Sequence, residues 1–160
     1  MLIILLRHAE RETRTDRTEA RQVLTPKGVL TADRLGRKLA EKLAEENLSV
    51  TRLLSSAYVR ATESAGLIVA HLGLPLAAIQ VLGVLQMEPE GSVEESFEPV
   101  LEAASNGVVV VGHGPELAEL CFRLCGQRIE LKKACALALE WDVTRKEGRL
   151  LWKISHKPDE

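Results

Sequence analysis

The chain has 160 residues, 46% of them hydrophobic, and 21 Lys and Arg against 23 Asp and Glu give a formal net charge of −2. This length and apolar share suit one compact core, so we expect a single domain over residues 1–160. The nearly balanced charge gives no electrostatic reason to expect a nucleic acid or an anionic membrane as a partner.

The first element is an unbroken apolar run from Leu2 to Leu6, followed directly by Arg7 and His8. A strand without a polar face suits the interior of a parallel sheet that helices cover on both sides. Ligands of such sheets bind beyond the carboxyl ends of the strands. The sequence therefore predicts that Arg7 and His8 lie at a functional site.

The next segments alternate between helical and extended patterns. Residues 9–24 are charged and polar without apolar periodicity, which predicts a surface loop. Thr25 and Pro26 are typical of a helix start, as cap and first helical residue. Apolar positions three to four apart predict helices over 26–46, 57–72, 93–104 and around 117–124, while strands are expected over 51–55, 79–82 and 108–111 and a loop over 86–92.

The last part of the chain has a different pattern. Two extended runs, 135–141 and 149–155, flank a polar turn that contains glycine, which predicts a hairpin with an antiparallel strand at the sheet edge. Together with the preceding alternation, this indicates an α/β fold: a three-layer α/β/α sandwich around a mostly parallel sheet with an antiparallel edge hairpin.

The cellular compartment is predicted from two features. The apolar start is too short for a secretion signal or a membrane span. Three cysteines without a Cys-x-x-C pair are typical of a reducing compartment rather than a disulfide framework. We therefore expect a cytoplasmic protein.

Chemistry-bearing residues follow three of the predicted strands. Arg7 and His8 follow the first, residues 55–60 with Arg60 follow the second, and His113 follows the all-apolar strand at 108–111. A parallel sheet would bring these strand ends to one edge. Two guanidiniums, two imidazoles and helix N-termini at one place favour a compact dianion, most simply a phosphoryl group.

A neutral imidazole can attack a phosphoryl group through one ring nitrogen while the other donates to a backbone carbonyl, which fixes the tautomer. Neighbouring arginines disfavour the imidazolium and help to keep His8 neutral. A metal site at His8 and His113 is disfavoured by the adjacent arginines and by the lack of a His-x-x-x-His motif or a carboxylate cluster. We expect neither metal nor cofactor.

The order Arg7-His8, then residues 55–60, then His113 resembles the histidine phosphatase superfamily, with its phosphoglycerate-mutase-like fold, over nearly the whole chain. The short length, the Leu-Thr-Pro-Lys-Gly at 24–28 and the loop at 85–91 are most similar to SixA-type phosphohistidine phosphatases. The resemblance implies that His8 becomes phosphorylated, that Arg7, Arg60 and His113 hold the transferring phosphoryl group, and that water then hydrolyses the intermediate.

Some positions depart from the family pattern. Ala9 replaces the commoner glycine after the histidine, and Ala57 replaces the proline before the arginine segment. Arg21 is a candidate for the phosphate-binding arginine that precedes Leu-Thr in relatives, although the spacing is longer by one. Ser56 and Tyr58 are candidates either for ligand contact or for capping the second helix.

The proton donor to the leaving group is left open between Glu88 and Glu90, both in the loop after the third strand. A sugar alkoxide is hard to expel without an acid, whereas protonated phosphohistidine leaves as a neutral imidazole whose conjugate acid has a pKa of about 6.5. The sequence therefore favours phosphohistidine on a protein as the substrate. The alternatives are a small-molecule phosphomonoesterase with Glu88 as the acid, and a catalytically silent phosphate-binding module; the oligomeric state is open.

Overall fold

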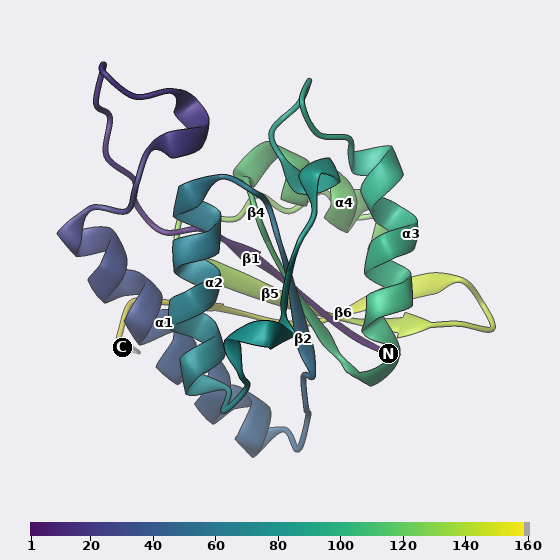
Figure 1. Cartoon of the computed structure of the whole chain (residues 1–160). Coiled ribbons are helices and arrows are strands. Elements are labelled where there is room, and N and C mark those ends of the chain that lie inside the picture. Colours follow the sequence, from purple (N-terminus) through teal and green to yellow (C-terminus); the bar gives the residue numbers. More distant parts are fainter. Residues whose placement is uncertain (159–160) are drawn as a thin grey trace.

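The structure is a computed structural model that describes residues 1–158. A six-stranded sheet has the order β3-β2-β4-β1-β5-β6 (Figure 1). Its strands are β1 (Leu2–Arg7), β2 (Arg52–Ser55), β3 (Ile79–Val81), β4 (Val108–Gly112), β5 (Cys135–Asp142) and β6 (Glu147–Ser155). The first four are parallel, β5 runs antiparallel to β1, and β6 pairs antiparallel with β5. The predicted strands and edge hairpin are confirmed.

Four α-helices of the described residues cover the two faces of the sheet: α1 (Pro26–Glu45), α2 (Val59–His71), α3 (Val93–Ala103) and α4 (Gly114–Cys125). Alternate residues of β1 point to opposite faces. Ile4 packs in the core that α1 and α2 cover, and Leu5 packs in the core that α3 and α4 cover. Figure 1 shows the two helix pairs on either side of the sheet. The predicted three-layer α/β/α sandwich is therefore confirmed.

The pairing of β1 with β4 brings the two histidines together. Arg7 lies opposite Gly112 at the carboxyl ends of these parallel strands, and the backbone N–H of His8 donates to the carbonyl of Gly112 at 3.2 Å. His8 and His113 follow directly after these strand ends. Two residues far apart in the sequence thus become neighbours because their strands share one register.

The start of α1 fixes the chain that leaves His8. The Thr25 hydroxyl accepts a hydrogen bond from the Gly28 N–H at 2.9 Å and caps the helix, as predicted. Gly28 packs so closely on the preceding segment that a Cβ there would lie 2.1 Å from the carbonyl oxygen of Glu10. The first turn of α1 therefore holds the backbone two residues after His8.

Residues 10–24, which we call the arm, form the predicted surface loop but have more internal structure than the sequence indicated. The arm contains a 3₁₀ turn, η1 (Glu19–Arg21), and an isolated bridge between Arg11 and Leu24. Gln22 is buried, and its amide nitrogen donates to the carbonyls of Arg14 and Arg17 at 2.6 and 2.9 Å. Figure 1 shows the arm projecting above α1 and α2.

No helix within residues 1–158 combines the length and apolarity that crossing a membrane requires.

Candidate active site

The two histidines are buried side by side at the carboxyl end of the sheet. The His8 and His113 rings have centroids 5.2 Å apart and are inclined by 63°. Each side chain belongs to the buried part of the protein, and the Tyr58 ring packs edge-on against His113 with centroids 4.9 Å apart. These contacts assemble the two imidazoles that the sequence analysis expected at one sheet edge.

His8 has one ring nitrogen free of a proton. Its Nδ1 lies 2.7 Å from the carbonyl oxygen of Ala9, and because a carbonyl only accepts, Nδ1 carries the proton. Its Nε2 accepts a hydrogen bond from Arg60 Nε at 3.2 Å. Burial lowers the pKa of His8 to about 3, and the charges of Arg60 and Arg7 act in the same direction. The Nε2 lone pair is therefore available near neutral pH.

His113 is oriented by Ser56. The Ser56 Oγ lies 2.9 Å from His113 Nε2 and also accepts a hydrogen bond from the Tyr58 N–H at 3.2 Å. His113 Nδ1 is buried and has no hydrogen-bond partner in the described part of the chain. The pKa of His113 is lowered to about 3, chiefly by burial. The charges of His8, Arg60 and Arg7 lower it further. Ser56 thus contacts the catalytic candidate His113 and the start of α2 together.

Arg7 is held between α4 and the segment before β5. Its NH1 donates to the carbonyl of Leu131 at 3.0 Å, whereas its buried Nε has no partner within residues 1–158. A Cβ on Gly114 would lie 3.0 Å from Cζ of Arg7, so the glycine provides room for the guanidinium. An oxyanion is the ligand that would satisfy Nε of Arg7, and it would also satisfy Nδ1 of His113 when that nitrogen carries the proton.

Arg60 is buried and contacts both His8 and the arm. Its Nε donates to His8, as described above. Its NH1 donates to the backbone carbonyl of Glu19 at 2.8 Å, and its NH2 donates to Glu19 Oε1 at 2.9 Å. NH2 also lies 3.2 Å from the Met87 sulfur, and Cζ lies 4.9 Å from the Tyr58 ring centroid. The sequence analysis did not single out Glu19, because nothing in a charged loop distinguishes a carboxylate that reaches the site.

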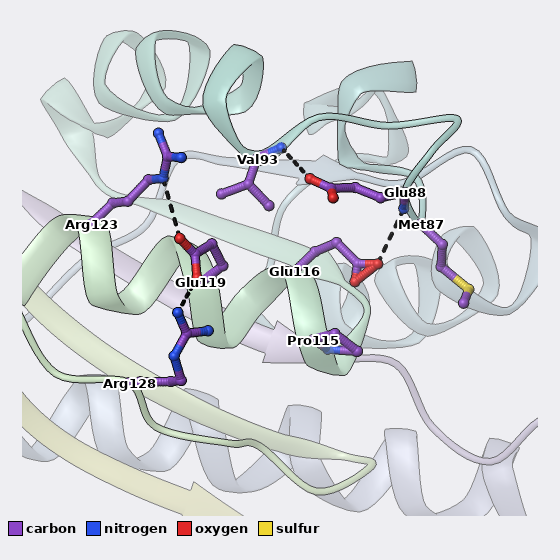
Figure 2. Close-up of a pocket in the computed structure, with 8 residues that line it drawn as sticks. All are labelled: Met87, Glu88, Val93, Pro115, Glu116, Glu119, Arg123 and Arg128. Carbon is purple, nitrogen blue, oxygen red and sulfur yellow. Dashed lines mark hydrogen bonds and ion pairs between the residues drawn. The ribbon is translucent and has the colours of Figure 1, made fainter.

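A groove of about 600 Å³ opens beside the site between α4 and the loop before α3. Figure 2 shows Glu88 and Glu116 on facing sides of this groove, with Glu119 between two arginines at its far end. Glu116 Oε1 accepts the backbone N–H of Glu88 at 3.3 Å, while Glu116 Oε2 is buried without a partner among residues 1–158. Glu116 also lines a smaller cavity together with His113.

Glu88, the first candidate acid of the loop, is exposed and contacts the start of α3. Glu88 Oε1 accepts the backbone N–H of Val93 at the start of α3, at 3.4 Å (Figure 2). Within residues 1–158, no hydrogen bond or ion pair joins Glu88 to His8, Arg60 or His113. Glu90 is exposed in the same loop. Glu116 lies beside His113, and the sequence analysis missed it because it reads as a helix-start acid.

Arg21, like Glu88, is a predicted site residue whose side chain makes no hydrogen bond or ion pair with the histidines or Arg60 among residues 1–158. It is exposed in η1 and lines a shallow hollow together with Asp16, Arg17, Thr18 and Val59. The structure therefore brings together Arg7, His8, Ser56, Arg60 and His113, but gives Glu88 and Arg21 other contacts. Residues 1–158 contain no group of three or more His, Cys, Asp or Glu side chains suited to a metal ion.

Comparison with known proteins places this geometry in context. The family model of the histidine phosphatase superfamily (branch 1) matches residues 3–83. Comparison with curated proteins gives no match.

Several solved structures share the fold. The protein histidine phosphatase SixA complexed with tungstate is 22% identical, with 98% of this chain and 97% of that chain covered and a TM-score of 0.82. The alpha-ribazole phosphatase from Shigella flexneri is 18% identical, with 98% and 97% covered and a TM-score of 0.74. A mycobacterial glucosyl-3-phosphoglycerate phosphatase is 15% identical, with 93% and 96% covered and a TM-score of 0.68. These similarities establish the shared phosphoglycerate-mutase-like α/β fold.

Proposed function

The chain belongs to the histidine phosphatase superfamily, and from this premise we propose that it hydrolyses phosphohistidine on proteins through a phosphoryl group carried by His8. One observation carries the proposal. His8 Nδ1 donates to the Ala9 carbonyl, so the opposite nitrogen, Nε2, has an unprotonated lone pair at the carboxyl end of the sheet. Burial keeps the pKa of this imidazole near 3, so the ring is a nucleophile at neutral pH.

In the first step, Nε2 of His8 attacks the phosphorus atom. The P–N bond to the substrate's imidazole breaks, its electron pair stays on the leaving nitrogen, and a new P–Nε2 bond forms. The Arg60 Nε–H, which faces Nε2 in the free protein, then donates to a phosphoryl oxygen. In the second step, water attacks the phosphorus atom and the P–Nε2 bond breaks, with its electron pair returning to Nε2. The water supplies the oxygen of inorganic phosphate, its protons pass to the phosphate and to solvent, and His8 is restored.

Arg7 and His113 supply the remaining hydrogen bonds to the phosphoryl group. Both present a buried nitrogen that lacks a partner in the described structure, Nε of Arg7 and Nδ1 of His113. If the Ser56 hydroxyl donates to His113 Nε2, the proton of His113 is on Nδ1 and can be donated to a phosphoryl oxygen. Fixed donors of this kind stabilise the charge of the transition state most where water is excluded.

The position of Glu88 favours a substrate whose leaving group needs no general acid, such as phosphohistidine. Glu88, the acid expected from the sequence, accepts the amide of Val93 rather than facing the histidines. Expelling an alkoxide without a general acid forgoes a factor of roughly 10² to 10⁴. A protonated phosphohistidine needs no such donor, because its ring already carries the proton with which it leaves.

The test is a quench experiment with a ³²P-labelled phosphohistidine protein in the presence of a chelator. We expect a transient label on His8 that is stable in base and labile in acid, together with release of phosphate. His8→Ala should lose both the label and turnover. Turnover that is unchanged in His8→Ala, or a wild-type chain that leaves phosphohistidine intact while hydrolysing other phosphates, would contradict the proposal.

A small-molecule phosphomonoesterase is the second candidate, because the groove of about 600 Å³ next to Glu116 and Met87 has room for a leaving group. In this case Glu88 would have to turn from the Val93 amide towards the substrate to act as the acid. A panel of sugar phosphates and nucleotides, assayed beside the phosphohistidine protein, separates the two candidates by their kcat/KM values.

A further inference from the structure

The Glu19 carboxylate joins two arginines, one of which contacts His8. Its Oε1 lies 2.9 Å from Arg60 NH2 and 3.1 Å from Arg11 NH2. The Glu19 side chain is 46% exposed, whereas that of Arg60 is 3% exposed. Glu19 therefore connects solvent with the buried guanidinium that donates to His8.

This contact occupies the outer end of Arg60 but leaves its inner nitrogen to His8. NH1 donates to the Glu19 backbone carbonyl and NH2 to the Glu19 carboxylate, while Nε remains on His8 Nε2. The phosphoryl group can thus still reach Arg60 from the His8 side. One carboxylate also offsets the charges of two guanidiniums, so an incoming anion meets less positive charge than the arginines alone would supply.

We propose that Glu19 determines the charge class of the substrate: it disfavours phosphates whose leaving group carries further negative charge and leaves phosphates with neutral or cationic leaving groups favoured. This inference rests on the proposed function and deepens it, because the protonated imidazole of phosphohistidine is such a leaving group. A phosphorylated carboxylic acid or a nucleotide would bring a second anionic group towards Glu19.

Two further carboxylates lie near Tyr58. The Tyr58 ring packs against His113 and Arg60. Burial raises the pKa of the Tyr58 hydroxyl, and the charges of Glu90, Glu19 and Glu116 act in the same direction. These acids come from three different segments: the arm, the loop before α3 and the first turn of α4. The buried guanidiniums of Arg7 and Arg60 thus have carboxylates near them, and neighbouring positive and negative charges suit a zwitterionic substrate.

The experiment uses Glu19→Gln, whose amide oxygen can still accept from Arg60 but carries no charge. Three substrates are compared: a phosphohistidine protein, 4-nitrophenyl phosphate, and 3-phosphoglycerate, whose leaving group carries a carboxylate. We expect the ratio of kcat/KM for phosphohistidine to that for 3-phosphoglycerate to fall about three- to fivefold, the size expected for a half-exposed charge. Glu19→Asp, which keeps the charge, should keep the wild-type ratio.

Glu98→Gln is the matched control, because it makes the same charge change at an exposed position of α3. Loss of activity by the same factor on all three substrates in Glu19→Gln would assign Glu19 a merely structural role and overturn the inference. Calorimetric binding of inorganic phosphate gives a readout that needs no turnover, and we expect it to tighten about three- to fivefold in Glu19→Gln. An unchanged affinity of Glu19→Gln for phosphate would overturn the inference about Glu19, even if phosphorylation of His8 is confirmed. Tighter phosphate binding in Glu19→Gln, without any hydrolysis of phosphohistidine by the wild type, would refute only the proposed function.

Discussion

Glu88 and Glu116 show how the contacts of a single carboxylate decide what it can contribute. Both line the groove between α4 and the loop before α3, and Glu88 accepts a hydrogen bond from the Val93 N–H. Glu116 accepts one from the Glu88 N–H with Oε1, whereas its buried Oε2 has no partner among residues 1–158. An unsatisfied buried acceptor has an energetic cost until a donor reaches it. Glu116 is therefore better placed than Glu88 to meet an N–H or O–H of a leaving group.

At this scale we predict the effect of Glu88→Gln. The glutamine can still accept the Val93 amide, so the fold should persist, and phosphohistidine hydrolysis should change less than about threefold, because an imidazole leaves without a general acid. Steady-state rates on a phosphohistidine protein and on an alkyl phosphate check this. Glu116→Gln is the matched variant, since it removes the other carboxyl but keeps an acceptor for the Glu88 N–H. A hundredfold loss on phosphohistidine in Glu88→Gln would show that Glu88 supplies an essential proton.

Among the elements, the first turn of α1 is the part most tightly fitted to the site. Gly28 touches the backbone of Glu10, two residues after His8, and the Thr25 cap lies in the same turn. The turn therefore connects the packing of a peripheral helix with the position of His8.

We predict opposite effects for two glycine-to-alanine substitutions in helices. Gly28→Ala places a Cβ 2.1 Å from the Glu10 carbonyl oxygen, so it should lower the free energy of unfolding by about 1–3 kcal/mol, as overpacking does. Gly66→Ala in α2 meets no atom within 4 Å and should raise the free energy of unfolding by about 0.5–1 kcal/mol. Urea denaturation of both variants measures the difference. Equal effects of the two substitutions would refute the close contact at Gly28.

The elements themselves were largely predictable from the sequence. The helix expected over 26–46 is α1 (Pro26–Glu45), and the all-apolar strand expected over 108–111 is β4 (Val108–Gly112), because apolar periodicity follows directly from burial. The segments that follow the strand ends then predicted four residues of the candidate site: Arg7, His8, Arg60 and His113. The contact of Glu19 with Arg60 and the direction of Glu88 were not predictable, since both lie in segments without periodicity, where tertiary contacts alone decide the orientation of a side chain.

For the molecule as a whole, the two buried neutral histidines lower the free energy of unfolding in acid. The pKa values of His8 and His113 are lowered from 6.5 to about 3, chiefly by burial. Between these values the unfolded chain binds protons that the folded chain does not, so the free energy of unfolding falls as the pH decreases from about 6.5 towards 3.

We therefore predict that stability decreases by roughly 1–3 kcal/mol between pH 6.5 and pH 5, where most carboxylates still remain ionised. Urea denaturation at several pH values measures this decrease. His8→Asn lacks one of the two rings, so it should lose about half of the pH dependence while it also loses turnover. The same slope in this variant as in the wild type would mean that His8 is not held neutral.

The separation of His8 from His113 along the chain has a consequence for the protein during its synthesis, because the two residues meet only when β1 pairs with β4. His8 is translated more than a hundred residues before His113, and three helices lie between them in the chain. A nascent chain that ends within α3 thus carries His8 without the strand that seats its partner. If His8 acts as proposed, we therefore expect its reactivity towards phosphate only after translation has passed β4 and the two strands have joined.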